Sequence, residues 1–121
     1  MKMPDYYTTE NPGGYGLEFN TEPDDSKIQV EIITLDSLNL ENVSFIKIDV
    51  EGHEPNVING SLATIQRCKP VMIVEILGGV TLETASHEQL EYINNTKLLI
   101  SSLGYDVKLI KNCDYLCIPA V

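Results

Sequence analysis

The stretch FIKIDVEGHEPNVINGSLATIQRCKPVMIVEIL, Phe45 to Leu77, decides the fold that this chain can adopt. It opens with a nearly all-apolar run and closes with another after Pro70, and such runs are typical of strands covered on both faces of a parallel sheet. Between them, apolar residues recur at helical spacing from Val57 to Ile65, behind Pro55, which suits the first turn of a helix. The stretch therefore predicts a strand, a helix near 54–68 and a second strand parallel to the first.

The rest of the chain adds elements on both sides of this unit. Upstream, KIQVEIITL (27–35) alternates like a strand with one wet face, and TLDSLNLENV (34–43) predicts a short helix or turn. Downstream, a capping box of Ser86 and Gln89 starts a helix near 86–103, and YDVKLIK and DYLCIPA are close enough to form a hairpin. We expect one α/β domain over residues 1–121: a mostly parallel sheet with a C-terminal antiparallel hairpin. Its first part, residues 1–26, is a polar segment, and NPGG within that segment predicts a turn.

Composition and charge narrow the range of partners. The 121 residues carry a formal net charge of −10, which argues against nucleic acid and anionic membranes as partners. No apolar run approaches the roughly 20 residues that cross a bilayer, and the N-terminus has no signal-peptide core. Three cysteines, an odd number without a C-x-x-C pair, predict reduced thiols in the cytoplasm and no zinc or other metal site.

The functional residues are expected where the strands end. In open α/β sheets, ligands bind outside the carboxyl ends of the strands. The sequence puts Asp49, Glu51, His53 and Glu54 at one such end and Glu75 at the next. If the two strands are neighbours, these side chains converge. Clustered carboxylates raise one another's proton affinity, so that a nearby histidine can act as a base, and such a cluster could also hold a hard divalent cation.

Three residues of this region also have purely structural interpretations. Glu54, next to Pro55, would stabilise the start of the helix through the helix dipole. Lys47, on the same face of its strand as Asp49, would be a buried lysine neutralised by Asp49 or Glu75, because a buried lysine without a partner is very costly. His53 would be a solvated loop residue.

The same stretch closely resembles the signature of FkbM-type methyltransferases. The shared pattern is an Ile-Lys-Ile-Asp strand, a Val-Glu-Gly-x-Glu turn, a helix with a glycine, and a proline before a strand that ends in Glu. The matching residues are Ile46, Lys47, Ile48, Asp49, Val50, Glu51, Gly52, Glu54, Gly60, Pro70 and Glu75. NPGG and TLDSL upstream, and LGYDV and DYLCIPA downstream, also look like segments of the family. The resemblance implies a class I, Rossmann-like methyltransferase fold with S-adenosylmethionine as the cofactor.

The sequence departs from the family pattern in one respect that matters for function. A class I methyltransferase holds its cofactor mainly on its first two strands, through a Gly-rich turn and an acidic residue for the ribose, and the sequence supplies neither. The resemblance therefore implies a partial fold whose N-terminal cofactor-binding half is missing. We expect the isolated chain to be inactive and not to bind S-adenosylmethionine tightly.

What remains resembles the acceptor side of an O-methyltransferase that acts on a small-molecule or sugar hydroxyl. In that interpretation His53 or Asp49 deprotonates the acceptor, while Glu51, Glu54 and Glu75 orient it. The alternative is a non-catalytic, truncated remnant that acts as a binding or assembly module.

The missing half also bears on assembly. SFIKIDV (44–50) would be a central strand in a complete enzyme, and without its neighbour it has an open apolar edge that can pair with another chain. We therefore expect a homodimer that hides this edge. The alternative is a monomer in which residues 1–26 fold back over their own sheet.

Overall fold

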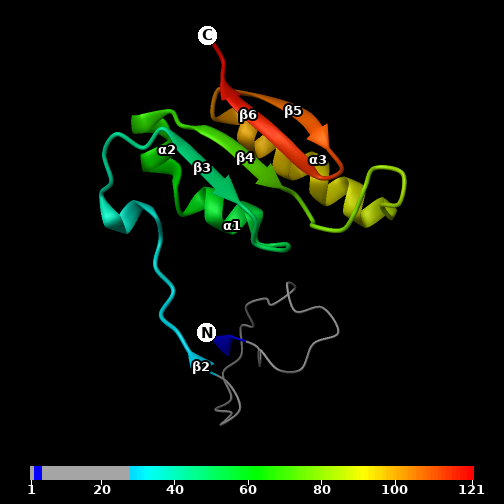
Figure 1. Cartoon of the computed structure of the whole chain (residues 1–121), viewed down its shortest axis with the longest axis horizontal. Coiled ribbons are helices and arrows are strands. Elements are labelled where there is room, and N and C mark those ends of the chain that lie inside the picture. The colour runs from blue at the N-terminus through cyan, green and yellow to red at the C-terminus, as the bar shows by residue number, and fades with distance from the viewer. Residues whose placement is uncertain (1, 4–27) are drawn as a thin grey trace. The chain divides into compact units, whose positions relative to one another are not determined.

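The computed structural model describes residues 2–3 and 28–121 (Figure 1). The chain divides into two compact units, Met1–Ile33 and Thr34–Val121, and each is described here by itself. The predicted turn at NPGG and nearly all of the polar segment 1–26 lie outside the described residues.

The first unit contains a two-stranded antiparallel pair. Strand β1, Lys2–Met3, pairs with strand β2, Ile28–Gln29, and neither strand belongs to the main sheet. The strand predicted over 27–35 is therefore wrong in its length. Alternation stabilises a strand only where one face is buried, and Ile28, Ile32 and Ile33 are all exposed.

The second unit holds the main sheet and all the α-helices of the described residues. In chain order its elements are the 3₁₀ turn η1 (Asp36–Leu38), β3 (Phe45–Ile48), α1 (Glu54–Asn59), α2 (Leu62–Cys68), β4 (Val71–Glu75), α3 (His87–Ser102), β5 (Tyr105–Lys111) and β6 (Asp114–Pro119). The four strands form a sheet in the order β3-β4-β6-β5. The predicted α/β class, the short turn at 34–43 and the C-terminal hairpin are confirmed.

The prediction of a mostly parallel sheet is wrong for these strands. Strands β3 and β4 are parallel neighbours, but β6 lies between β4 and β5 and is antiparallel to both. Helix α3 returns the chain so that β5 runs in the same direction as β4, as expected for a helical crossover. It leaves one strand position vacant, however, and the tight turn after β5 lets β6 fill it in the opposite direction (Figure 1).

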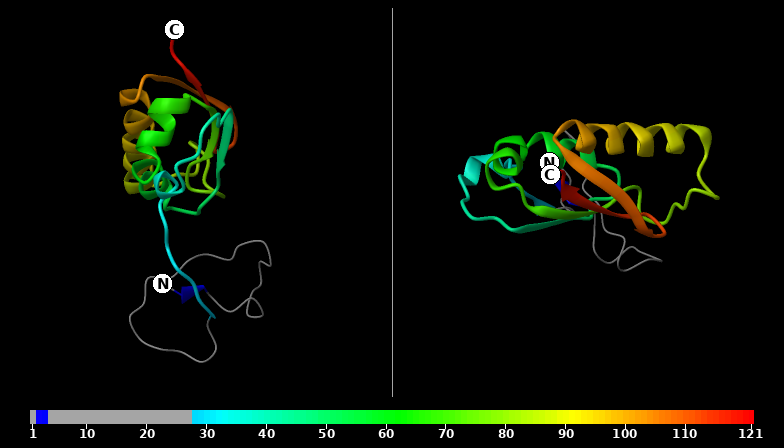
Figure 2. Two further views of the ribbon diagram at one scale, coloured as in Figure 1. Left: turned by 90° about the vertical axis from the view of Figure 1, so that its left-hand side faces the viewer. Right: turned by 90° about the horizontal axis from the view of Figure 1, so that it is seen from above.

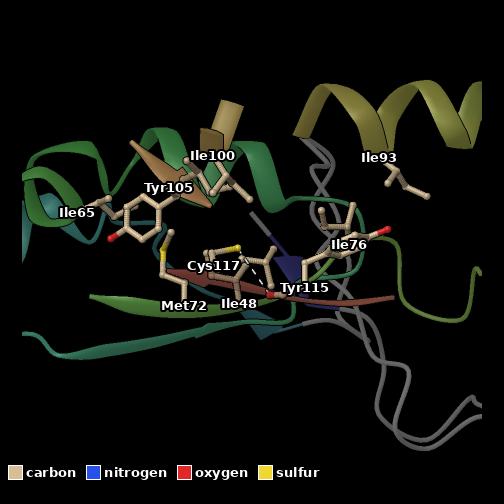
Figure 3. Close-up of a cluster of buried hydrophobic side chains, with 11 residues drawn as sticks. Ile48, Ile65, Met72, Ile76, Ile93, Ile100, Tyr105, Tyr115 and Cys117 are labelled. Atoms are coloured by element: carbon tan, nitrogen blue, oxygen red, sulfur yellow. Dashed lines mark hydrogen bonds between the residues drawn. The ribbon is translucent and has the colours of Figure 1, made fainter. Parts of the chain in front are cut away.

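All three α-helices cover one face of the sheet (Figure 2). The core between the two layers consists of apolar side chains from every strand and α-helix of this unit (Figure 3). Its buried members are Ile48, Ile58, Ile65, Met72, Val74, Ile76, Ile93, Ile100, Tyr105, Tyr115 and Cys117. The inward-pointing residues of the strands thus meet the apolar sides of the helices.

The opposite face of the sheet is open. Phe45 of β3 is 51 % exposed and Ile118 of β6 is 46 % exposed, and Lys47 is exposed on the same face as Phe45. The prediction that this strand is covered on both faces is therefore wrong, and so is the prediction of a buried Lys47. The alternation of the run FIKI is incomplete, because the apolar Phe45 lies on the exposed face together with Lys47, while both isoleucines lie on the inward face.

The helix predicted over 54–68 is interrupted by Asp36. In a continuous helix the Thr64 amide would donate to the Gly60 carbonyl. Instead the Asp36 amide donates to the Gly60 carbonyl at 2.9 Å, and the Asp36 carboxylate accepts from the Ala63 and Thr64 amides at 3.0 and 2.9 Å. Partial burial opposes ionisation of Asp36, but these hydrogen bonds outweigh it and hold the pKa of the carboxyl below its usual range. The turn η1 thus caps α2 from outside.

Helix α3 confirms the prediction made from its start signal. The Ser86 hydroxyl accepts from the Gln89 amide, and the Gln89 side chain accepts from the Ser86 amide, which is a complete capping box. None of the helices among residues 28–121 is both long and apolar enough to cross a membrane. Cys68, Cys113 and Cys117 are free cysteines.

Candidate functional site

Three carboxylates form a row across the sheet. Ile48 of β3 is opposite Val74 of β4, so Asp49 and Glu75 follow in register at the carboxyl ends of the two parallel strands. Glu75 is in turn opposite Asp114, the first residue of β6, and Asp114 is opposite Lys111 of β5. We call Asp49, Glu75 and Asp114 the carboxylate row. Because side chains alternate along a strand, the row lies on the open face that also carries Phe45.

Glu75 lies at the centre of the row, and its protonation reflects its neighbours. Partial burial raises the pKa of the Glu75 carboxyl, and the charge of Asp49, a hydrogen bond with Asp49 and the charge of Asp114 raise it further. Asp49 and Glu75 therefore converge, as the sequence predicted for neighbouring strands. A proton on Glu75 would relieve this repulsion and form the hydrogen bond to Asp49.

We expect Glu75→Gln to stabilise the fold near neutral pH. The pKa of Glu75 is raised above its ordinary value of 4.5. The contribution of Glu75 to the stability of the fold is therefore favourable below pH 4.5 and is lost as the pH rises through the raised pKa. Near neutral pH the variant should gain about 0.5 kcal/mol, because like charges opposite each other in a sheet are destabilising. The gain should vanish in acid, well below the ordinary pKa of a glutamic acid.

Urea titrations of both proteins across this pH range measure the effect. Glu91→Gln, an exposed position on α3, is the matched control and should change little at any pH. A constant difference between Glu75→Gln and the parent protein at all pH values would contradict the proton-sharing interpretation.

Two turns with unusual backbone angles adjoin the row. After β3, Glu51 and Gly52 both have positive φ, 50° and 96°, and after β4, Leu77 has φ 52°. The next residue, Gly78, admits a close approach: a Cβ there would lie 2.6 Å from Glu75 Oε1 and 3.9 Å from Glu51 Oε1. The Glu51 and Glu75 carboxylates thus both approach Gly78.

Glu54 belongs to the interior. Its side chain is 0 % exposed, and its carboxylate accepts from the Gly52 amide at 2.7 Å and from the Leu77 amide at 2.9 Å. The Tyr92 hydroxyl of α3 donates to it at 3.4 Å. Burial and the Glu54 charge raise the pKa of Tyr92 to about 12, so that its hydroxyl keeps its proton. Glu54 therefore joins the two turns that carry Glu51 and Gly78, whereas the acceptor-orienting role expected from the sequence would need an accessible carboxylate.

His53 occupies the junction between the first turn and α1. It is the N-cap residue of that helix, with its carbonyl accepting from the Val57 amide at 3.1 Å, and it is half-buried. Its side chain makes no cap hydrogen bond, and neither does Glu54 act as the N-cap. His53 follows directly after Gly52, three residues from Val50, so that a short turn separates it from the carboxylate row.

Several residues near the row escaped the sequence-based prediction. A cavity of about 360 Å³ opens beside it, lined by Glu75, by residues 79–81 and by residues 112–114. The donor atoms of Glu75, Cys113 and Asp114 lie within 4.8 Å of one another, close enough to hold a cation, although the sequence predicted no metal site. Cys113 donates weakly to Glu75 Oε1 at 3.7 Å. A prediction that β6, rather than β5, lies against β4 would have placed Asp114 beside Glu75 from the sequence.

The fold is an α/β sheet whose parallel strands β3 and β4 end in acidic residues, at the edge where open α/β sheets generally bind their ligands. The sequence matches the family described as the methyltransferase FkbM domain over residues 4–107. Since this match covers most of the chain, the protein belongs to the FkbM methyltransferase domain family, and the resemblance drawn from the sequence is confirmed. Membership implies a methyltransferase-like function and, for the family in general, S-adenosylmethionine dependence. No curated protein and no solved structure matches the chain significantly.

Proposed function

We propose that the carboxylate row and the adjoining turn form the acceptor side of an S-adenosylmethionine-dependent O-methyltransferase acting on a small-molecule or sugar hydroxyl. The observation that carries this proposal is the position of Asp49 and Glu75 next to the last paired residues of two parallel strands, with Glu75 lining a cavity. Carboxylates accept hydrogen bonds from hydroxyl groups, and a polyol can bridge several of them. Glu51 and Glu75, which both approach Gly78, are the proposed orienting residues.

The proton of the acceptor hydroxyl goes to Asp49 or to His53 in this proposal. Asp49 is exposed and shares a hydrogen bond with Glu75, so a hydroxyl that displaces Glu75 from it reaches a carboxylate acceptor directly. His53 is the alternative base, because histidine is the side chain that most often serves as a general base in enzymes, and it lies on the same turn as Glu51. Glu54 acts as a positioning residue that holds this turn against the turn after β4.

S-adenosylmethionine would supply the methyl group. The acids of this edge would repel its carboxylate but attract its ammonium and sulfonium groups, so charge alone does not decide between acceptor and cofactor. A class I methyltransferase holds its cofactor mainly through a Gly-rich turn and an acidic residue for the ribose, and the sequence supplies neither. We therefore assign no cofactor contact to residues 34–121, and we expect no micromolar binding of S-adenosylmethionine by the 121-residue chain.

Amide-resolved NMR titration tests the proposal on the chain as it is. Monosaccharides and small diols are the acceptor probes, and S-adenosylmethionine is titrated separately. An acceptor should shift the amide signals of Glu51, Gly52 and Gly78. The double variant Asp49→Asn/Glu75→Gln should weaken that binding by about tenfold, the loss expected for two charged hydrogen-bond acceptors.

Glu91→Gln on α3 is the control and should bind like the parent protein. Shifts confined to other parts of the sheet, or equal binding by the double variant, would reject the acceptor site and favour the non-catalytic binding or assembly module. Micromolar binding of S-adenosylmethionine would overturn the division between acceptor and cofactor surfaces.

A further inference from the structure

Strand β3 has an open edge within the second unit. It stands first in the order β3-β4-β6-β5, so its other side has no neighbour among residues 34–121. The Val71 amide of β4 donates to the Ser44 carbonyl, which shows that the backbone groups of even-numbered residues point toward β4. Those of Phe45, Lys47 and Asp49 therefore point outward, because backbone directions alternate along a strand. Unpaired outward groups are a template for another strand.

The charges next to this edge favour one register for pairing it with a second copy of the chain. In an antiparallel two-fold pair, the core-facing side chains of both β3 strands must lie on the same side of the joined sheet. One strand can therefore be shifted against the other only in steps of two residues. With Ile48 opposite Ile48 of the partner subunit, Lys47 lies opposite the partner's Asp49, and this contact occurs twice. One step away, Lys47 would lie opposite the partner's Lys47, and like charges in that position repel.

The selected register also extends the carboxylate row. Within one chain the row runs Asp49, Glu75, Asp114, and Asp114 is opposite Lys111 of β5 in the strand register, so one end of the row has a cationic residue next to it and the other does not. The partner's Lys47 would lie beside Asp49 at that other end. A row of three carboxylates would then be flanked by a cation on each side, which relieves the repulsion that a single chain retains.

We propose that the protein forms a two-fold homodimer by antiparallel pairing of its β3 edges, with Lys47 of each copy beside Asp49 of the other. The dimer joins two four-stranded sheets into one continuous sheet of eight strands. It brings the open apolar faces around Phe45 and Ile118 side by side in one larger surface. The candidate site then contains a residue from each copy, since the partner's Lys47 completes the row at Asp49.

A charge-swap experiment tests the register. Sedimentation equilibrium on the 121-residue chain at low micromolar concentration, in about 0.15 M salt, should give a dimer mass. Salt at this concentration screens the attraction between two side chains in direct contact only modestly. Lys47→Asp should raise the dissociation constant at least about tenfold, because two attractive contacts become repulsive. The double variant Lys47→Asp/Asp49→Lys recreates both contacts in reverse and should return the dissociation constant to within about threefold of the parent protein.

Lys108→Asp is the matched control, since Lys108 is exposed on β5 at the far edge of the same sheet. It should leave the dissociation constant within about threefold, as for a charge distant from the interface. Carbodiimide treatment of a mixture of ¹⁴N- and ¹⁵N-labelled protein should link Lys47 to Asp49 in peptides of mixed isotope. A monomer mass would overturn the proposal and favour the alternative that the chain's own N-terminal segment covers the β3 edge. A dimer whose dissociation constant is unchanged by Lys47→Asp, or is not restored in the double variant, would also overturn it.

Discussion

Replacing Glu54 by alanine is expected to cost about 3–5 kcal/mol of unfolding free energy, a large part of what a domain of this size possesses. The variant would leave the Gly52 and Leu77 amides and the Tyr92 hydroxyl without their acceptor. Each buried donor that loses its partner costs about 1–3 kcal/mol. The two amides carry most of the effect, because their distances of 2.7 and 2.9 Å are short.

Two further variants separate the roles of the Glu54 oxygens. Both oxygens accept from a backbone amide, and glutamine has one acceptor and one amino group, so Glu54→Gln must bring an N–H group against an amide. It should cost about 2 kcal/mol although its shape is nearly unchanged. Tyr92→Phe removes the longer contact of 3.4 Å and should cost about 1 kcal/mol or less.

Guanidinium or urea titration gives the free energies, and hydrogen exchange at Gly52 and Leu77 locates the change. We expect faster exchange at both amides in Glu54→Ala and at one of them in Glu54→Gln. A Glu54→Ala variant as stable as the parent protein would show that the carboxylate does not hold the two turns together.

The second large effect is expected in the core, for Ile100→Ala. Ile100 lies on α3, is 0 % exposed and belongs to the cluster between the helices and the sheet (Figure 3). Removing three carbon atoms there should cost about 2–5 kcal/mol, through lost burial and the cavity that remains. Leu98→Ala is a close control, because Leu98 is two residues away on the same helix and 66 % exposed.

Alanine favours a helix at both positions, so differences in helix propensity cannot explain a contrast between the two variants. Leu98→Ala should therefore change the unfolding free energy by no more than about 0.5 kcal/mol. Urea titration at a common slope measures both. Equal losses would mean that α3 packs on the sheet through a different face from the one described.

The periodicity of apolar residues and the helix-start signals predicted helices and strands correctly where local interactions determine them. Helix α3 begins where Ser86 and Gln89 can cap it, and its capping box needs no partner from elsewhere in the chain. The predicted convergence of Asp49 and Glu75 also holds, because parallel neighbours bring their carboxyl ends to the same edge whatever the details of packing. The signature from Phe45 to Glu75 sufficed to identify the family.

The signature did not indicate, in contrast, which of the site residues are buried and which are exposed. Asp49, Glu51, His53 and Glu54 lie within six residues, yet Glu54 is buried while Asp49 and Glu51 are exposed. The positive φ angles at Glu51 and Gly52 reverse the chain and turn Glu54 inward. The Glu54 carboxylate accepts a hydrogen bond from the Leu77 amide, which lies 23 residues away in the sequence. A local sequence pattern contains no information about such a distant partner.

What the sequence alone determined is therefore the set of local elements, the strand ends that carry the acids, and the family. The tertiary structure decided which strands became neighbours, where the helix between β3 and β4 is interrupted, and which face of the sheet stays open. Asp36 interrupts that helix by taking the Thr64 amide 28 residues along the chain, and Asp114 enters the carboxylate row because β6 rather than β5 lies against β4. Both are long-range hydrogen-bonding choices, and their free energy depends on groups that approach one another only once the chain has folded.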